Sequence, residues 1–210
     1  MITLYDYWRS SASYRVRIAL NLLGLPYESH PVDLLAGDQR GESNLARNPQ
    51  GLVPTLEIDR QTLTQSLAII EYLDETHGPL WLPKDPPGRA RVRTLSYAIA
   101  MEIAPICNLS VRRHAAKISH GDITADDWQR HYITKGFAAF ESMLTQPQTG
   151  RYCHGDQITM ADLCLVPQVY NAERADVDLT AFPRLTLINE ALQAVPAIAA
   201  AHPDRANPAA

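Results

Sequence analysis

Residues 2–20 read ITLYDYWRSSASYRVRIAL, and this stretch decides the fold of the N-terminal part of the chain. Its first five residues have the pattern of a short buried strand. Beyond them, apolar residues recur at helical spacing at Val16, Ala19, Leu20 and Leu23. Gly24 predicts the end of this helix, because glycine readily adopts the left-handed conformation found just beyond a helix. A strand therefore leads directly into a helix, with serines at the junction.

The segments that follow complete an α/β domain. Residues 27–34 are predicted to form a second strand. Residues 53–58 and 62–64 predict a hairpin with a turn between them, and residues 66–77 predict a helix. The order βαβ followed by ββα is that of a thioredoxin-like domain, which we assign to residues 1–78.

The rest of the chain has a different character. Residues 79–88 read PLWLPKDPPG and predict a linker, because proline is excluded from helix interiors and central strands. Residues 89–210 predict an all-helical domain, whose tail from residue 199 onward we expect to be loosely held. The expected helices span residues 89–117 with a kink at Pro105, 124–144, 159–173 and 185–195.

The start of the third of these helices has a clear sequence signal. Residues 158–163 read ITMADL, with Thr159 at the N-cap and Asp162 three residues later. This is a capping box with aspartate in place of glutamate, and Ile158 can pack onto Leu163 as a hydrophobic staple. The pattern predicts a buried helix with a well-defined beginning.

The composition excludes several classes of function. The 19 Lys and Arg against 23 Asp and Glu give a net charge of −4 without any basic block, so nucleic acid is not an expected partner. No apolar run approaches the ~20 residues that a membrane span needs. The N-terminus lacks a basic segment followed by an apolar one, so no secretory signal is predicted. We therefore expect a cytoplasmic protein that does not bind membranes.

The cysteines agree with this expectation. The three cysteines, Cys107, Cys153 and Cys164, form no CxxC pair, which predicts reduced thiols in a cytosolic protein. Cys153, His154 and Cys164 come nearest to a metal cluster, but a structural zinc site needs four ligands. No metal site is therefore predicted.

Serines crowd the predicted start of the first helix. One of them would serve as its N-cap, which is the ordinary structural role of serine. The free N–H groups and the positive end of the helix dipole also favour an anion there. A thioredoxin-like domain carries CxxC at this position, whereas this chain reads Ser10-Ser11-Ala12-Ser13. If a sulfur acts at this helix end as a thiolate, a ligand has to supply it.

Two dipeptides extend this prediction to the ligand. In a thioredoxin-like domain Val53-Pro54 would be cis and would turn the backbone of Val53 toward an extended peptide, although only about 5–6% of ordinary X-Pro bonds are cis. Ser66, after Gln65, is predicted as the N-cap of its helix and creates a second anion site. Two anion sites beside an extended backbone edge suit a small peptide with an acidic end and a central thiol. Glutathione fits this description.

Several longer runs carry a family resemblance. They are SSASYRVRIAL (10–20), NPQGLVPTL (48–56), TQSLAIIEYL (64–73), NLSV (108–111) and ITMADLCLVPQVYNAER (158–174). Over residues 2–183 or so, the chain resembles the zeta class of glutathione transferases. The resemblance implies a homodimer with glutathione as cofactor. It also implies cis–trans isomerisation of maleylacetoacetate to fumarylacetoacetate in tyrosine and phenylalanine catabolism, by thiolate addition, bond rotation and elimination.

The resemblance implies roles for particular residues. Ser10 and Ser11 would act in catalysis at the thiol. Glutathione would be bound by Ser10, Ser11, Ala12, Ser13, Tyr14, Arg15, Gln39, Val53, Pro54, Gln65, Ser66, Asn108 and Ser110. Arg9 and Arg174 would hold the carboxylates of a small dicarboxylate substrate, since a guanidinium matches a carboxylate with two hydrogen bonds. The alternative for Arg174 is a helix-end cation favoured by the helix dipole.

The chain departs from the family pattern at two positions. Ala12 stands where the family usually has cysteine, so either that cysteine is not required or the activity is altered. Ala104 stands where glutamine or histidine is expected, which puts one polar contact to the ligand in doubt.

Three alternative functions stay open. A maleylpyruvate isomerase would use the same chemistry on a smaller substrate, but Leu109 after Asn108, in place of arginine, favours maleylacetoacetate. A general transferase would conjugate or dehalogenate small haloacids and consume glutathione. A non-catalytic interaction module would be favoured by a broken thiol site, whereas Ser10 and Pro54 are both present.

Overall fold

The computed structural model describes residues 1–78 and 80–207. Pro79, in the predicted linker, and residues 208–210, at the end of the predicted helical domain, lie outside the described residues. The described chain divides into two compact units. The first unit comprises residues 1–78 and 195–207, and the second comprises residues 80–194.

A four-stranded sheet forms the centre of the first unit. Its strands, in the order β2-β1-β3-β4, are β2 (Glu28–Pro31), β1 (Thr3–Asp6), β3 (Thr55–Ile58) and β4 (Gln61–Thr64). β1 pairs in parallel with β2 and antiparallel with β3, and β3 and β4 form the predicted hairpin. Asp59 and Arg60 in its turn both have positive φ, of 51° and 62°, as a tight hairpin turn of the I′ type requires.

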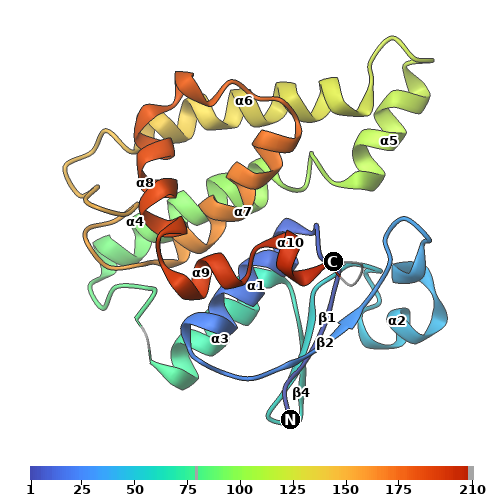
Figure 1. Cartoon of the computed structure of the whole chain (residues 1–210), viewed down its shortest axis with the longest axis horizontal. Coiled ribbons are helices and arrows are strands. Elements are labelled where there is room, and N and C mark those ends of the chain that lie inside the picture. The colour runs from blue at the N-terminus through green and yellow to red at the C-terminus, as the bar shows by residue number, and fades with distance from the viewer. Residues whose placement is uncertain (79, 208–210) are drawn as a thin grey trace. The chain divides into compact units, whose positions relative to one another are not determined.

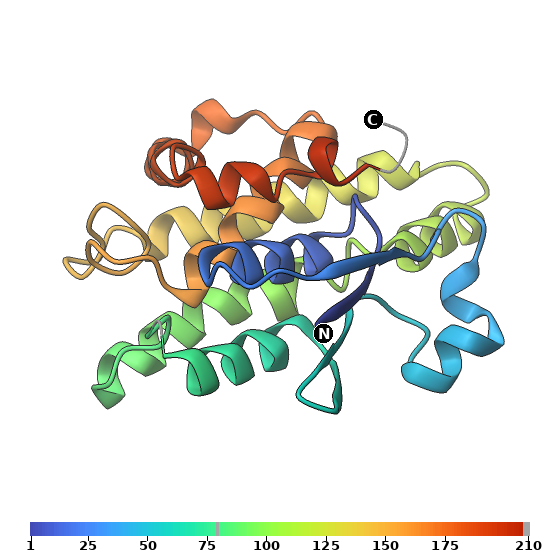
Figure 2. The same ribbon diagram turned by 60° about the horizontal axis from the view of Figure 1, so that its bottom comes forward.

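The described helices of the first unit are α1 (Ser11–Leu22), η1 (Asp38–Arg40), α2 (Glu42–Arg47), α3 (Ser66–His77), α9 (Pro196–Ala200) and α10 (Pro203–Ala206). Of these, α3 and α9 pack against α1. Figures 1 and 2 both show α1 lying between α3 and α9. Gly24 follows α1 with a φ of 64°, as predicted. The sequence did not predict α2, which buries only Asn44 and so lacks an apolar helical period.

A buried ion pair joins β1 to α1. Asp6 and Arg17 pair through their side chains, with only 3% and 2% of the residues exposed. The same guanidinium donates to the carbonyl oxygens of Trp8 at 2.8 Å and Ala201 at 3.2 Å, and Ser29 donates to Asp6 at 2.8 Å. Every one of these bonds lies within the first unit, and together they satisfy two charges that would otherwise be costly to bury.

The C-terminal segment belongs to the first unit, so two predictions were wrong. Residues 199–207 are not loosely held, because Ile198 and Ala201 are buried and Asn21 of α1 donates to the carbonyl of Ala197 at 3.2 Å. The helical domain therefore does not run from residue 89 to the end of the described chain. Alanine-rich sequence gave no sign of this docking, because small side chains bury well without a strong periodic pattern.

The second unit is all-helical, as predicted. Its elements are α4 (Pro86–Tyr97), the π-helix η2 (Ala98–Ile103), α5 (Leu109–Ile118), α6 (Ala125–Met143), α7 (Met160–Arg174), η3 (Leu179–Ala181) and α8 (Pro183–Gln193). The first ten residues of α7 are all buried, and α7 packs against α4 and α8. Of the described helices, none is long and apolar enough to cross a membrane.

Prolines set two boundaries differently from the prediction. α4 begins inside the predicted linker, since Asp85 caps it by accepting from the Gly88 N–H at 2.7 Å. Proline is well tolerated at the first helical position, where its missing N–H is not needed.

The predicted helix over residues 89–117 is broken rather than kinked. Residues 104–108 separate η2 from α5, and Pro105 in this break cannot donate a helical hydrogen bond.

The predicted capping box of α7 is present. Asp162 is fully buried and accepts from the N–H and the hydroxyl of Thr159, both at 2.8 Å. It also accepts from the N–H of Cys153 at 2.9 Å. Burial raises the pKa of Asp162, and these hydrogen bonds oppose that rise. The cap therefore ties the loop before α7 to the helix.

Candidate functional site

The N-terminus of α1 places the predicted serines in different roles. Ser10 is the N-cap, and its Oγ accepts from the Ser13 N–H at 3.2 Å. The hydroxyl hydrogen of Ser10 is still available to donate. In the described part of the chain, the N–H groups of Ser11 and Ala12 have no protein acceptor. One hydroxyl and two backbone donors thus gather at the positive end of the helix dipole.

The next three predicted residues of α1 point into the first unit. Ser13 is fully buried, and its Oγ accepts from the Tyr7 N–H at 3.5 Å. Tyr14 is fully buried, with its ring 6.2 Å from that of His202. Arg15, 2% exposed, donates to Ser66 Oγ at 3.2 Å. These side chains hold the helix end in place, and Arg15 links it to the start of α3.

Ser66 is not the N-cap of α3, contrary to the prediction. Gln65 occupies the cap position with φ 68° and ψ 110°, and Ser66 is the first helical residue. The left-handed φ of Gln65 turns the chain one residue earlier than a serine cap would. Ser66 is 6% exposed and accepts from Arg15, while the exposed Gln65 donates to Gln50 Oε1 at 2.7 Å.

The loop before β3 presents unpaired backbone groups. The Val53-Pro54 bond is cis, as predicted. Within residues 1–78 and 80–207, no protein group bonds the backbone N–H or C=O of Val53. Outside this loop, in η1, Gln39 Oε1 is buried without a partner among the described residues. Unsatisfied groups of this kind favour a hydrogen-bonding ligand, because a buried polar atom without a partner is costly.

Asn48 was missed by sequence reasoning. It is 2% exposed and accepts from the Gln50 N–H at 3.1 Å while donating to the Leu52 carbonyl at 3.0 Å. These bonds shape the loop that delivers Val53. The run Asn-Pro-Gln-Gly at residues 48–51 is a turn signal that could have identified it.

The second unit holds the remaining predicted residues. Asn108 is the N-cap of α5 without a side-chain capping bond, and both it and Ser110 are exposed. Arg174 is the last residue of α7, exposed, with its guanidinium 5.6 Å from the centre of the Tyr170 ring. Arg9, by contrast, lies on the first unit, half-buried and stacked 4.4 Å over Trp8.

Two of the three thiols, those of Cys107 and Cys153, are poor nucleophiles. Burial raises the pKa of Cys107 to about 11, against a smaller opposing effect of Arg112. Burial also raises the pKa of Cys153 well above its usual range, and the Asp162 charge adds to this. Both therefore stay protonated at neutral pH.

In the described chain no group of three or more His, Cys, Asp and Glu side chains could hold a metal.

Family comparisons agree with this arrangement. Residues 4–84 match the family described as glutathione S-transferase, N-terminal domain. Residues 115–201 match glutathione S-transferase, C-terminal domain. The chain belongs to the glutathione S-transferase family. The chain is 60% identical over 207 residues to the maleylacetoacetate isomerase of Rhizobium meliloti (strain 1021), covering 98% of this chain and 97% of that protein.

Solved structures identify the class of this family to which the chain is similar. The holo structure of a bacterial maleyl pyruvate isomerase in zeta class superposes with a TM-score of 0.94 at 41% identity, covering 98% of each chain. Maleylacetoacetate isomerase from Methylobacterium extorquens AM1, with bound malonate and glutathione, superposes with a TM-score of 0.93 at 40% identity, covering 99% of each chain. The predicted fold and the predicted resemblance to the zeta class are confirmed.

Proposed function

We propose that this protein is a glutathione-dependent isomerase that converts maleylacetoacetate to fumarylacetoacetate in tyrosine and phenylalanine catabolism. The observation that carries the proposal is the N-terminus of α1, where Ser10, Ser11 and Ala12 offer donors but no cysteine. The high identity to the Rhizobium meliloti isomerase supports the same substrate.

Glutathione fits the groups of the first unit. The backbone of Val53 offers one donor and one acceptor to an extended peptide, and Gln39 Oε1 offers a buried acceptor. Gln65 and Ser66, at the start of α3, offer an anion site for the acidic end of the peptide. When bound, glutathione supplies a thiolate that adds to the cis double bond, permits rotation and leaves again unchanged.

Ser10 is the residue that activates the thiol. A cysteine-like thiol has a pKa of ~8.5, and lowering it by two requires about 2.7 kcal/mol. A hydrogen bond to a charged acceptor contributes ~1.5–3 kcal/mol, and the helix dipole ~0.3–1 kcal/mol. The Ser10 hydroxyl and the free N–H groups of α1 are therefore together of the right strength. Asn108 and Ser110 are the proposed contributions of the second unit to glutathione binding.

Arg9 and Arg174 are the proposed ligands of the two substrate carboxylates. The malonate bound in the Methylobacterium extorquens structure supports a dicarboxylate substrate.

Replacing Arg174 by lysine keeps the charge but removes the planar fork of the guanidinium. We expect Arg174→Lys to raise KM for dicarboxylate substrates about tenfold while the pKa of bound glutathione stays unchanged. A normal KM in both Arg174→Lys and Arg174→Ala would return Arg174 to the role of a helix-end cation.

Glutathione consumption separates the proposed function from its alternatives. Isomerisation should need only catalytic amounts of glutathione, because the thiol is released in each cycle. The test measures glutathione by thiol titration during turnover of maleylacetoacetate and maleylpyruvate, assayed side by side. Stoichiometric loss of thiol would instead indicate a conjugating or dehalogenating transferase. Faster turnover of maleylpyruvate would favour that substrate, as does the similarity to the maleyl pyruvate isomerase structure.

The proposal also includes the oligomeric state and the cellular location of the protein. We expect a homodimer, as the zeta-class resemblance implies, and sedimentation at micromolar concentration should yield twice the mass of one chain. The presence of a single-chain species alone would contradict a homodimer.

We also expect the protein in the cytoplasm, and its recovery in the membrane or secreted fraction would contradict this expectation.

A further inference from the structure

The end of α7 has a specific backbone turn. The Val177 N–H donates to the Ala172 carbonyl at 3.0 Å, and the Asp176 N–H donates to the Glu173 carbonyl at 3.2 Å. These two bonds form a Schellman motif. The residue that takes the left-handed conformation in this motif is usually glycine, but here it is Asp176 with a φ of 52°. Aspartate is less favourable than glycine in this conformation, so contacts from outside the helix can stabilise the turn immediately after Arg174.

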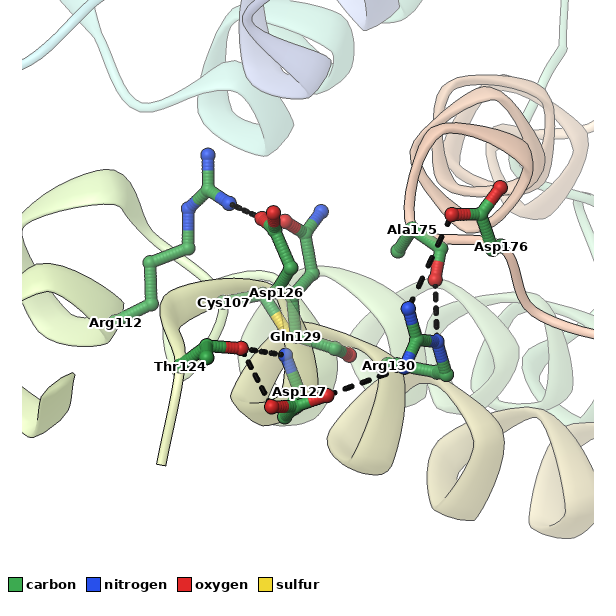
Figure 3. A network of polar contacts seen from close by, with 9 residues as sticks. All are labelled: Cys107, Arg112, Thr124, Asp126, Asp127, Gln129, Arg130, Ala175 and Asp176. Atoms are coloured by element: carbon green, nitrogen blue, oxygen red, sulfur yellow. Dashed lines mark hydrogen bonds and ion pairs between the residues drawn. The ribbon is translucent and has the colours of Figure 1, made fainter. Parts of the chain in front are cut away.

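Arg130 of α6 supplies that support. Its Nε donates to the carbonyl oxygen of Ala175, the C-cap of α7, at 2.8 Å. Its Nη2 lies 3.9 Å from the carboxylate of Asp176, the strained residue itself. Figure 3 shows the guanidinium reaching both groups from one side. A cation at the C-terminus of a helix is also favoured by the helix dipole.

The guanidinium is held from its other side as well. Its Nη1 donates to Asp127 Oδ1 at 3.2 Å. Asp127 is bound by Thr124, the N-cap of α6, whose hydroxyl donates to Oδ2 at 2.6 Å. The Thr124 hydroxyl, followed by smaller effects that include the Arg130 charge, lowers the pKa of Asp127, so the carboxylate stays ionised. The first turn of α6 thus fixes Arg130 against the last turn of α7 (Figure 3).

We propose that Arg130 is a positioning residue for the reaction, which holds the last turn of α7 so that Arg174 keeps its orientation toward a substrate carboxylate. The inference rests on the proposed function of Arg174. Lysine would not reproduce these contacts, because they come from three separate nitrogens of the planar guanidinium, whereas the donors of an ammonium all sit on one nitrogen. Arg130 itself need not touch the substrate.

The test compares Arg130→Met with Arg184→Met. Methionine keeps much of the apolar stem but removes the hydrogen bonds. We expect Arg130→Met to raise KM for maleylacetoacetate about tenfold, since a small misplacement of a binding group is costly, and to leave kcat and glutathione affinity close to the parent values. Arg184 of α8 is an exposed arginine that pairs with Glu141 of α6 at 3.6 Å. It is the matched control, and its replacement should leave KM unchanged.

A double variant distinguishes positioning from a general structural role. If Arg130 acts through Arg174, Arg130→Met should have no further effect on KM in an Arg174→Met background. A normal KM in folded Arg130→Met, or a full additional effect in the double variant, would overturn the inference. Its failure is distinct from that of the proposed function, because only the latter gives a normal KM in Arg174→Met alone.

Glycine at residue 176 provides a second, independent variant. Asp176→Gly removes the left-handed strain, so the turn should hold without Arg130. We expect the double variant Arg130→Met/Asp176→Gly to have a KM that returns most of the way from the raised value to that of the parent. This double variant is also the one to measure if Arg130→Met alone fails to fold. A KM in the folded pair as high as in Arg174→Met would contradict a role of Arg130 through this turn.

Discussion

Replacing Ser10 by alanine is expected to lower kcat about 10- to 100-fold, because the thiolate loses a hydrogen bond worth ~1.5–3 kcal/mol. The pKa of bound glutathione should rise toward the ordinary ~8.5 of a thiol. Thiolate absorbance measured across a pH series gives the pKa, and steady-state assays give kcat. An unchanged kcat and thiol pKa in Ser10→Ala would remove Ser10 from catalysis.

Ser10 also caps α1, so its two roles have to be separated. Ser10→Asp keeps a capping oxygen for the Ser13 N–H but places a carboxylate beside the thiolate, and should lose activity without loss of stability. Ser10→Thr keeps both the cap and the hydroxyl and should retain activity.

Ser13→Ala should act mainly on stability, because Ser13 is fully buried and its hydroxyl oxygen accepts from the Tyr7 N–H. Ala12→Cys should be tolerated, since the family usually has cysteine there.

Replacing Asp6 by alanine is expected to destabilise the protein by about 3–5 kcal/mol, because it leaves the charge of Arg17 buried and uncompensated. Arg17 is only 2% exposed, and its guanidinium also donates to the Ala201 carbonyl of the C-terminal segment. Typical domains have about 5–15 kcal/mol of stability in total, so the loss would be large. Urea unfolding followed by circular dichroism measures it.

Asp126→Ala is the matched control for this effect. Asp126 also pairs with an arginine, Arg112, at 2.9 Å, but its side chain is 75% exposed (Figure 3). Exposed ion pairs contribute little to stability, so the unfolding midpoint should stay close to that of the parent. Equal destabilisation by the two variants would show that burial of the Asp6–Arg17 pair is not the cause.

Local sequence signals predicted much of the fold. Alternation and turn residues identified the β3–β4 hairpin, and the capping box identified the start of α7 to the residue. The same signals failed where tertiary contacts decide. The predicted helix over residues 89–117 is broken at 104–108, and α2 has almost no buried face from which a period could be read.

The candidate site divides in the same way. Ser10, Val53 and Gln65 were predicted because each sits at a defined position of the βαβ–ββα order. The inward orientation of Ser13 and Arg15, and the shift of the α3 cap from Ser66 to Gln65, depend on packing between α1 and α3. Asn48 and Arg130 act through hydrogen bonds to backbone carbonyls, which leave no pattern in the side-chain sequence.

The sequence by itself determined the strands, the main helices, the absence of a dithiol at the start of α1 and the family to which the chain belongs. These depend on periodicity, caps and turns, whose physics acts within a few residues. Only the tertiary structure decided that residues 195–207 dock onto α1 and that Arg17 binds Asp6 and Ala201 in one buried network. It also decided that Arg130 supports the end of α7. The residues joined by such contacts are separated in the sequence by between 11 and 184 positions. Their free energy comes from burying charges and carbonyls that no local pattern reveals.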